Sequence, residues 1–368
     1  MKVVFRSDAS LQIGTGHVMR CLTLADALVS KGADCQFICR AHEGNLIEFI
    51  RGKGYVAHSL PIAPATDADS TAPCLDAPDL VHSHWLGATQ AQDAAACAHI
   101  LQELRPDWLI VDHYALDSRW ERALAPHYRK LMVIDDLADR PHTCDVLLDQ
   151  TFDREATDYC PLVSDTCHLL CGSQYALLRP EFATLRPYSL QRRAQPVLRE
   201  LLITMGGVDK DNATGQVLQA LRTCALPSDC RITVVMGATA PWLNVVLTQA
   251  QDMPWSTRVL VGVNDMAQLM ADSDLAIGAA GATSWERCCL GVPTIMIVLA
   301  ENQIKVAEGL ESAGAARRVG LAQVDSRQLN ELLVSLIDDS SQLLQMSACA
   351  AGVVDGTGVN SVMRQMEV

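Results

Sequence analysis

The chain has 368 residues, 49% of them hydrophobic and 20% charged, and its formal net charge is −14. This length exceeds what one hydrophobic core normally serves, so we expect two domains of about 150–200 residues. The acidic balance argues against nucleic acid or an anionic membrane surface as a general partner. No apolar run reaches the roughly 18 residues of a membrane span, and the amino terminus is typical of a strand rather than a signal peptide, so we expect a cytoplasmic protein.

The first stretch of interest runs from Arg6 to Arg20 and joins a predicted strand to a predicted amphipathic helix. Ligands bind at the carboxyl ends of parallel strands, where a helix start offers free N–H groups, so we predict a reactive loop here. Gly14 and Gly16 would let the backbone approach a ligand, and His17 is the natural proton acceptor. The Gly-x-Gly-x-x-Gly pattern of dinucleotide sites is not met. The alternative is that the glycines only shape a turn and His17 caps the helix.

Hydrophobic periodicity predicts alternating strands and helices through the first half. Strands are expected at 3–5, 34–40, 55–60, 108–111, 131–134, 146–150 and 168–172, and helices at 19–29, 46–51 and 90–104. Residues 61–80 are rich in proline and indicate a surface loop. Residues 186–196 combine proline, arginine and glutamine without apolar periodicity, so we interpret them as an interdomain linker.

The second half begins a new series of strands and helices. A strand from 201 leads to a glycine turn at Gly207, and Asp209 and Asn212 are placed to cap the next helix. Further strands are expected at 232–236 and 257–263. The sequence therefore predicts an α/β protein of two doubly wound parallel-sheet domains, residues 1–186 and 197–368, facing each other across a cleft.

The positions of the cysteines and histidines limit which disulfides, metal sites and catalytic bases the chain can have. The fourteen cysteines include no Cys-x-x-Cys pair and mostly fall at apolar positions, so we expect reduced thiols rather than disulfides or zinc. All ten histidines lie at or before His168, so an imidazole base must come from the first half. Asp112, Asp135 and Asp136 end predicted strands and are either metal ligands or caps of the following turn; we favour caps and expect no metal.

Residues 274–286 carry the clearest binding signal of the second half. A strand runs into small residues, and a helix then starts with Thr283, Ser284 and Glu286. A diphosphate fits such a helix start, and a carboxylate can accept both hydroxyls of a ribose. The alternative is a capped helix with a capping-box glutamate. Further along, Asn302 and Gln303 either bind sugar hydroxyls or begin the next helix.

Several motifs together resemble a known family, the UDP-2,4-diacetamido-2,4,6-trideoxy-β-L-altropyranose hydrolases of pseudaminic acid biosynthesis (PseG). They are Arg6-Ser-Asp-x-Ser-x-x-Ile-Gly-x-Gly-His17, Val-Asp-His-Tyr114, Asp135-Asp136, Cys-Gly-x-x-Tyr175-Ala-Leu-Leu-Arg179 and Met-Gly-Gly207-x-Asp209. The second half is also similar to the nucleotide-binding half of the peptidoglycan N-acetylglucosaminyl transferase MurG. Both resemblances imply the GT-B fold of two Rossmann-like domains.

The resemblance implies that UDP lies in the second half, with Val263 near uracil, the turn at 281–284 near the diphosphate and Glu286 on the ribose. It implies a UDP-activated diacetamido trideoxy sugar as substrate and no cofactor. The residues expected to contact substrate are Arg6, Gly14, Gly16, Gly207, Val263, Gly281, Thr283, Ser284, Glu286, Asn302 and Gln303, and the catalytic set is His17, Tyr114 and Asp8.

The chemistry of the leaving group agrees with a single base. Ordinary glycosides need an acid and a base because an alkoxide leaves poorly, whereas UDP departs as a stabilised anion. His17 activating water opposite UDP would give C–O cleavage with inversion, without metal. Asp8 and Asp112 are candidates to orient His17. Three rivals stay open: a glycosyltransferase of the same fold, a hydrolysing 2-epimerase, and a catalytically silent nucleotide-sugar sensor.

Overall fold

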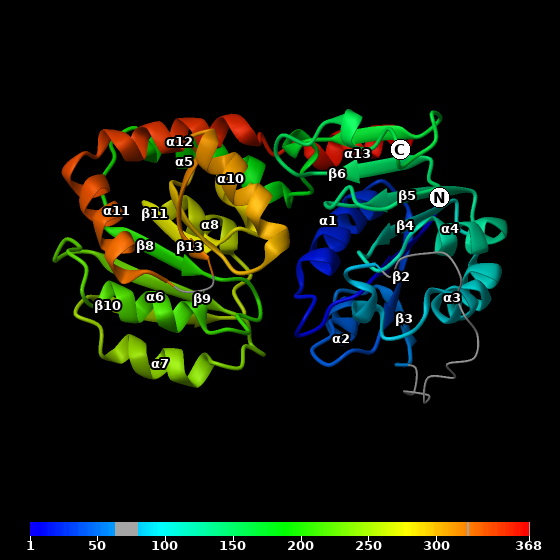
Figure 1. Cartoon of the computed structure of the whole chain (residues 1–368), viewed down its shortest axis with the longest axis horizontal. Helices are drawn as coiled ribbons and strands as arrows, with labels where there is room; N and C mark the ends of the chain where they lie inside the picture. The colour runs from blue at the N-terminus through cyan, green and yellow to red at the C-terminus, as the bar shows by residue number, and fades with distance from the viewer. Residues whose placement is uncertain (63–79, 322–323, 368) are drawn as a thin grey trace. The chain divides into compact units, whose positions relative to one another are not determined.

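The computed structural model describes residues 1–62, 80–321 and 324–367, which form two compact units. The first unit comprises residues 1–150, 154–175 and 359–368, and the second comprises 151–153 and 176–358. Most of the expected surface loop, residues 63–79, lies outside the described residues. The chain therefore begins in one unit, builds the other, and returns to the first for its last helix, drawn in red in Figure 1.

The first unit is built on a seven-stranded parallel sheet in the order β3-β2-β1-β4-β5-β6-β7. Its strands are β1 (Lys2–Ser7), β2 (Asp34–Arg40), β3 (Val56–Leu60), β4 (Trp108–Asp112), β5 (Lys130–Ile134), β6 (Val146–Asp149) and β7 (His168–Cys171). Its helices are α1 (Gly16–Ser30), α2 (Ile47–Gly52), α3 (Gln90–Leu104), α4 (Ser118–Leu124) and α13 (Gly358–Gln365), with short 3₁₀ turns η1 (Ser83–Leu86), η2 (Ala125–His127), η3 (Ala156–Asp158) and η4 (Ser173–Tyr175).

The second unit repeats this plan with six parallel strands in the order β10-β9-β8-β11-β12-β13. Its strands are β8 (Glu200–Thr204), β9 (Arg231–Met236), β10 (Ser256–Val261), β11 (Leu275–Ala279), β12 (Thr294–Val298) and β13 (Ala316–Leu321). Its helices are α5 (Pro180–Arg193), α6 (Ala213–Leu221), α7 (Leu243–Gln251), α8 (Met266–Asp272), α9 (Thr283–Cys289), α10 (Ile304–Ser312), α11 (Ser326–Asp338) and α12 (Ser341–Val353), with the 3₁₀ turn η5 (Glu301–Gln303).

In each sheet, the strand order reverses between two central strands that are far apart in sequence. β1 lies beside β4 in the first unit, and β8 lies beside β11 in the second. The chain leaves such neighbouring strands in opposite directions, which opens a crevice at their carboxyl ends where ligands bind. Both sheets are covered by helices, so the central strands are continuous apolar runs buried on both faces. The two predicted loops, after β1 and after β11, each lie at such a point.

The predicted linker is wrong. Most of residues 186–196 form the second half of α5, and the division between units falls at 175–176 instead of 186–197. This helix lacks apolar periodicity because it docks through polar groups. Arg186 donates to the carbonyls of Ala351 and Val354, and Arg193 donates to the carbonyls at the end of α8. Hydrophobic patterning cannot detect a helix held by such contacts.

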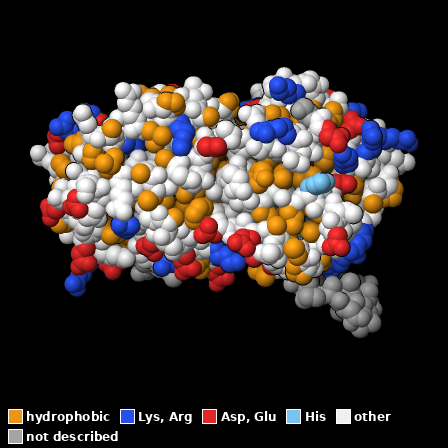
Figure 2. All heavy atoms as spheres, turned by 90° about the horizontal axis from the view of Figure 1, so that it is seen from above, with side chains coloured by type: hydrophobic (Ala, Val, Ile, Leu, Met, Phe, Trp, Pro, Cys, Tyr) orange, Lys and Arg blue, Asp and Glu red, His pale blue; other side chains and the backbone are white. Residues whose placement is uncertain are grey.

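Charge and hydropathy of the surface follow the composition. In the part of the chain that the structure describes, no helix is both long and apolar enough to cross a bilayer. On the face shown in Figure 2, Lys and Arg side chains are interspersed with Asp and Glu side chains. The cysteines of the described ranges carry no disulfide.

Candidate functional site

The loop after β1 presents His17 to the end of β4. His17 is the second residue of α1, and its Nδ1 lies 2.6 Å from Oδ1 of Asp112, the last residue of β4. Ser7 pairs with Asp112 in the sheet, so the strand register itself brings this carboxylate beneath the loop. The Asp112 side chain is fully buried, whereas the His17 side chain keeps 10% of its surface exposed. Asp112 therefore orients the imidazole without sealing it from solvent.

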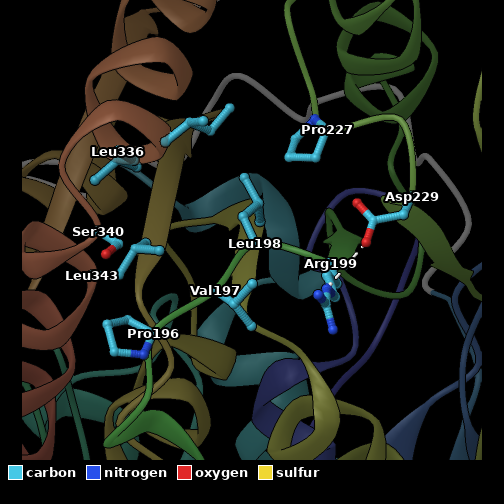
Figure 3. Close-up of a pocket in the computed structure, with 10 residues that line it drawn as sticks. Pro196, Val197, Leu198, Arg199, Pro227, Asp229, Leu336, Ser340 and Leu343 are labelled. Carbon is cyan, nitrogen blue, oxygen red and sulfur yellow. Dashed lines mark ion pairs between the residues drawn. The ribbon is translucent and has the colours of Figure 1, made fainter.

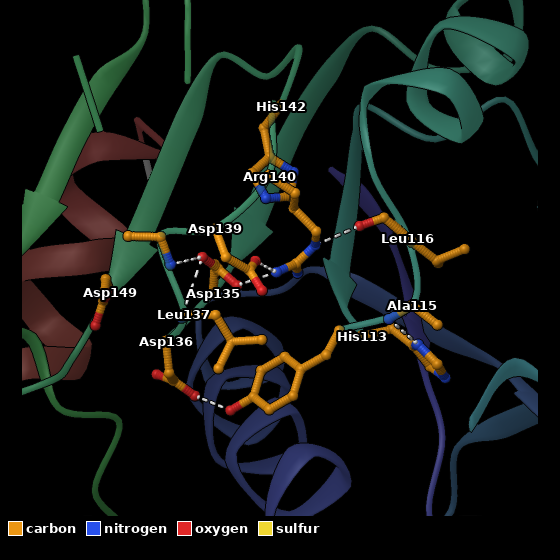
Figure 4. Close-up of polar contacts among 12 residues, drawn as sticks. His113, Ala115, Leu116, Asp135, Asp136, Leu137, Asp139, Arg140, His142 and Asp149 are labelled. Carbon is orange, nitrogen blue, oxygen red and sulfur yellow. Dashed lines mark hydrogen bonds and ion pairs between the residues drawn. The ribbon is translucent and has the colours of Figure 1, made fainter. Parts of the chain in front are cut away.

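Arg20, one helical turn after His17, holds Asp112 in place. Its Nε and Nη2 lie 2.6 and 2.7 Å from the two Asp112 oxygens, and its Nη1 lies 2.7 Å from Oδ2 of Asp136. The Tyr114 hydroxyl donates to that same Asp136 oxygen at 2.6 Å (Figure 4). The Tyr114 ring packs edge-on against the His17 ring, with centroids 4.5 Å apart. The five side chains thus form one closed network.

Electrostatics fix the proton positions in this network. Burial alone would favour neutral Asp112, but Arg20 and His17 outweigh it and hold the pKa of this carboxyl well below its ordinary value. The Asp112 anion only accepts hydrogen bonds, so Nδ1 of His17 carries the hydrogen between them, and in the neutral form of the ring the lone pair is on Nε2. Burial and Asp136 raise the pKa of the Tyr114 phenol well above its ordinary value. Nε2 of His17 is therefore the ring nitrogen able to accept a proton, and Tyr114 is a hydrogen-bond donor.

Two members of this network, Arg20 and Asp136, were not among the predicted site residues. The spacing of three residues between His17 and Arg20 was an available signal, because it puts both on one helix face. Asp136 was weighed only as a cap or metal ligand. Its neighbour Asp135 does act as a cap, since its Oδ2 accepts the N–H groups of Leu137 and Ala138, and it also pairs with Arg140 (Figure 4).

An aromatic wall, which we define as His82, Trp85 and Tyr114, stands beside the network. The Trp85 and Tyr114 rings are stacked with centroids 5.8 Å apart, and the His82 ring lies 4.4 Å from Trp85 and 5.6 Å from Tyr114. His82 and Trp85 come from the η1 turn and its N-cap and are half-buried. The wall is thus continuous with the His17 ring through Tyr114 and offers an apolar surface next to that ring.

Arg6 and Asp8, predicted to contact substrate and to assist catalysis, are placed differently. Both are fully buried, and Arg6 Nη1 lies 2.6 Å from Asp8 Oδ1 while Arg6 Nη2 lies 2.8 Å from Asp93. The second Asp8 oxygen faces Nε2 of His113 at 3.2 Å. Arg6 thus has no surface left for a ligand, and Asp112 rather than Asp8 orients His17. Breaking this buried ion pair to bind a substrate would leave an uncompensated buried charge, so both residues have a structural role.

The glycine turn itself has the predicted geometry. Gly14 has φ +80°, a conformation that a β-carbon disfavours, and its N–H donates to the Ser10 carbonyl at 2.9 Å. Gly16 begins α1, and the N-cap residue Thr15 makes no side-chain capping bond. Within the described ranges, no side chain accepts the first N–H groups of this fifteen-residue helix, which start beside His17. Contact of either glycine with a ligand stays a prediction.

In the second unit, the turn after β8 contains Gly207 and packs closely. A β-carbon on Gly237 would lie 1.9 Å from the Gly207 carbonyl oxygen, so the two turns touch backbone to backbone. Asp209 accepts the N–H groups of Ala213 and Thr214 at 2.8 and 2.9 Å, and Asn212 accepts that of Gly215. The predicted capping roles of Asp209 and Asn212 are confirmed.

The turn after β11 brings Gly281 and Thr283 to the second reversal point. Thr283 is half-buried, but Ser284 is fully buried, so Ser284 is wrong as a direct ligand contact. Arg287 lies behind both, with Nη1 3.1 Å from Thr283 Oγ1 and Nη2 3.1 Å from Ser284 Oγ. The hydroxyl of Ser284 is thus directed to the inside of the turn.

Glu286 faces the same region and is largely desolvated. Its side chain is 18% exposed and lies 3.9 Å from Nη2 of Arg179, which pairs more closely with Glu181 at 3.0 Å. Burial raises the pKa of Glu286 to about 7, although Arg179 and Arg287 oppose that shift. The alternative, a capping-box bond, is not found among the described residues of α9, whose N-cap Ala282 makes no side-chain bond. The carboxylate is therefore available to a ligand.

Three further residues of the second unit were predicted to contact the substrate: Gln303, Val263 and Asn302. Gln303 Oε1 accepts the N–H of Leu299 at 2.9 Å, and its Nε2 lies 4.0 Å from where a β-carbon on Gly281 would be. Val263 follows β10 and is half-buried. Asn302 lies in η5, and its side chain lies outside the described residues. Gln303 and Gly281 are thus brought together as expected.

A cavity of about 250 Å³ in the second unit is lined by Pro196, Leu198, Leu336 and Leu343, among others (Figure 3). Residues 196–199 precede β8, so the cavity lies at the amino end of that strand. The turns at Gly207 and Gly281 follow the carboxyl ends of β8 and β11, at the opposite edge of the sheet. This cavity is therefore not the predicted nucleotide site. Within the described ranges, no group of three or more His, Cys, Asp or Glu is placed to hold a metal ion.

Comparison with known proteins bears on both units. Residues 201–362 match the glycosyltransferase family 28 C-terminal domain. The chain is 27% identical over 315 residues to the UDP-2,4-diacetamido-2,4,6-trideoxy-β-L-altropyranose hydrolase of Campylobacter jejuni, covering 85% of this chain and 97% of that protein. It is 31% identical over 163 residues to the spore coat polysaccharide biosynthesis protein SpsG of Bacillus subtilis, covering 44% of this chain and about half, 48%, of that relative.

A solved structure confirms the fold. The crystal structure of MurG from Acinetobacter baumannii superposes with a TM-score of 0.71 at 16% identity, covering 100% of this chain and 99% of that one. The predicted GT-B fold, with two Rossmann-like parallel-sheet domains, is therefore confirmed. The resemblance drawn from the motifs is confirmed as well.

Proposed function

We propose that this chain, a relative of the UDP-diacetamido trideoxy sugar hydrolases over most of its length, hydrolyses a UDP-activated diacetamido trideoxy sugar to the free sugar and UDP. The observation that carries the proposal is the His17–Asp112 pair at the reversal point of the first sheet. Such hydrolysis needs one base, because UDP leaves as a stabilised anion. The reaction would serve pseudaminic acid biosynthesis, as the name of the relative suggests.

The first unit supplies the base. Nε2 of His17 takes a proton from water as the water oxygen attacks the anomeric carbon, the C–O bond to the β-phosphate breaks, and the configuration inverts. Asp112 stabilises the imidazolium that forms, and Arg20 keeps Asp112 in position. Because the leaving group is already an anion, the step as proposed requires no metal.

The second unit holds UDP. The turn at Gly281 and Thr283 receives the diphosphate, the Glu286 carboxylate accepts the ribose hydroxyls, and Val263 lies near uracil. Support comes from the position of this turn after β11 and from the family 28 match over residues 201–362. Gly207, Asn302 and Gln303 complete the proposed contacts.

The sugar meets the aromatic wall. Two acetamido methyls and the C6 methyl make a diacetamido trideoxy sugar less polar than a common hexose, and such groups pack well on aromatic faces. Trp85 and Tyr114 present this surface beside His17. The wall therefore favours a deoxy, acetylated sugar over a polyhydroxylated one.

The test is to incubate the protein with UDP-activated diacetamido trideoxy sugars and UDP-N-acetylglucosamine, with and without a chelator, and to follow UDP and free sugar. We expect equimolar UDP and free sugar from the diacetamido substrates, unaffected by chelator. Deuterium at C2 of the product would indicate a 2-epimerase, and turnover only with an added acceptor would indicate a glycosyltransferase. Binding of the sugar nucleotide without turnover would indicate a catalytically silent sensor. Each of these three results would overturn the proposal.

A further inference from the structure

Arg287 is a buried cation that forms no ion pair among the described residues, although the Glu286 carboxyl acts on it electrostatically. Its side chain is 1% exposed, and within the described residues no carboxylate comes within ion-pair distance of its guanidinium. Its contacts are neutral oxygens: the Ala279 carbonyl at 2.7 Å and the hydroxyls of Thr283 and Ser284 at 3.1 Å. Its Nε is buried without a hydrogen-bond partner. Burying a charge in this way is expensive unless something compensates it.

The guanidinium lies directly against the reversal point of the second sheet. A β-carbon on Gly278 would come within 2.6 Å of Arg287 Nη1 and within 2.9 Å of the Thr204 carbonyl, so only glycine leaves room for this side chain between β8 and β11. Burial lowers the pKa of Arg287 to about 10, which is still far above neutrality, so the group stays charged at pH 7. The fold thus makes space for a positive charge under the turn at Gly281 and Thr283.

We propose that Arg287 is a positioning residue for the diphosphate of a nucleoside diphosphate sugar, supplying the countercharge from behind the turn. This inference rests on the proposed UDP site of the second unit. Arg287 donates to the oxygen of Thr283, so the hydroxyl hydrogen of Thr283 is free to donate outward to a phosphate oxygen. The charge of the ligand then compensates the buried cation, and the two stabilise each other.

The test compares three ligands that share uridine and differ in the number of phosphate charges. Calorimetric affinities for uridine, UMP and UDP are compared between wild type and Arg287→Met. We expect about a tenfold or greater loss for UDP, a smaller loss for UMP and less than about a twofold change for uridine. Arg287→Lys, which keeps the charge, should recover most of the UDP affinity. Thr283→Val should weaken UDP binding while leaving uridine binding unchanged.

The matched control is Arg193→Met in the same unit. Arg193 is also buried, also held by carbonyl oxygens, and its pKa is also lowered by burial to about 10. Arg193 is the last residue of α5 and its guanidinium contacts the end of α8, so its loss should change all three affinities equally or not at all. If Arg287→Met does not fold, Arg287→Gln removes the charge and keeps hydrogen-bonding groups.

Equal losses for uridine, UMP and UDP in Arg287→Met would show a merely structural role and overturn the inference. Unchanged UDP affinity in that variant would do the same. Failure of the wild type to bind UDP would instead contradict the proposed nucleotide site, so the two failures are distinguishable.

Discussion

Buried arginines are treated oppositely in the two units. In the first unit, each is paired with carboxylates: Arg6 with Asp8 and Asp93, Arg20 with Asp112 and Asp136, Arg40 with Asp93, Arg140 with Asp135 and Asp139, and Arg154 with Asp149. In the second unit, Arg193 and Arg287 bond only to carbonyl and hydroxyl oxygens among the described residues. Burial lowers the pKa of both to about 10. In Arg6 and Arg20, the neighbouring carboxylates outweigh burial and raise the pKa.

The difference teaches what each unit is built to do. A catalytic base must be held in one orientation and one tautomer, and a neutralised network of paired charges does that without a ligand. A phosphate site must instead keep positive charge uncompensated until the anion arrives. The first unit therefore satisfies its charges internally, whereas in the second unit we propose that the charge of Arg287 is compensated by the diphosphate of the substrate.

The largest effect should come from breaking the base itself. His17→Ala should lower kcat by about 10²–10⁴-fold, because water is no longer deprotonated as it attacks. Asp112→Asn should cost a comparable factor, since an amide can donate to Nδ1 and so favour the wrong tautomer. UDP release measures turnover, and calorimetry with UDP should show affinity within about twofold of wild type. Turnover retained in His17→Ala would remove this residue from the mechanism.

The next effect separates paired from unpaired arginines by stability. Arg20→Met leaves the buried Asp112 carboxylate without its arginine partner and should lower the free energy of unfolding by about 3–5 kcal/mol. Arg193→Met leaves only neutral oxygens without a donor and should lower the free energy of unfolding by less, about 1–3 kcal/mol. Urea unfolding at pH 7 compares the two variants. A larger loss of unfolding free energy in Arg193→Met than in Arg20→Met would contradict the contrast between paired and unpaired buried arginines.

Much of the fold followed from local patterns. The strands at 34–40 and 146–149 and the helix at 90–104 were predicted closely because apolar periodicity and capping residues agree there. The helix α5 was missed because its docking uses arginine and serine rather than an apolar face. The return of α13 to the first unit has no local signal, since only tertiary contacts decide it.

The site was predicted in part for a similar reason. Sequence places His17 in a glycine turn, and strand register then selects Asp112 as its partner, which no spacing in sequence reveals. Arg6 was predicted to contact substrate because it belongs to the first motif of the family resemblance. Burial beside Asp93, a residue 87 positions away, makes it structural. Long-range pairing of charges is what the sequence alone could not supply.

Glu286 is a buried acid of the second unit, and its raised pKa makes the free energy of unfolding depend on pH. Its pKa, raised by burial to about 7 from an ordinary 4.5, means that its contribution to stability is complete below pH 4.5 and is lost as pH rises through 7. Gln mimics the protonated acid. Relative to wild type, Glu286→Gln should therefore gain about 2 kcal/mol of unfolding free energy between pH 5.5 and pH 8. Denaturant unfolding without nucleotide measures this difference, and parallel pH profiles for the two proteins would contradict the raised pKa.

The smallest expected effect concerns the aromatic wall, through which we propose that the first unit contacts the sugar by apolar surface instead of charge. Trp85→Ala should raise KM for the sugar nucleotide by about 3–10-fold and change kcat little, because stacking binds ground and transition states alike. Trp85→Phe should keep most of the affinity. Trp242→Ala is the control, since Trp242 is an exposed tryptophan of the second unit, at 39%. A lowered melting temperature with unchanged KM in Trp85→Ala would mean that the wall only packs against Tyr114. A raised KM for diacetamido sugars, with little change for UDP-N-acetylglucosamine, would tie the wall to the methyl groups.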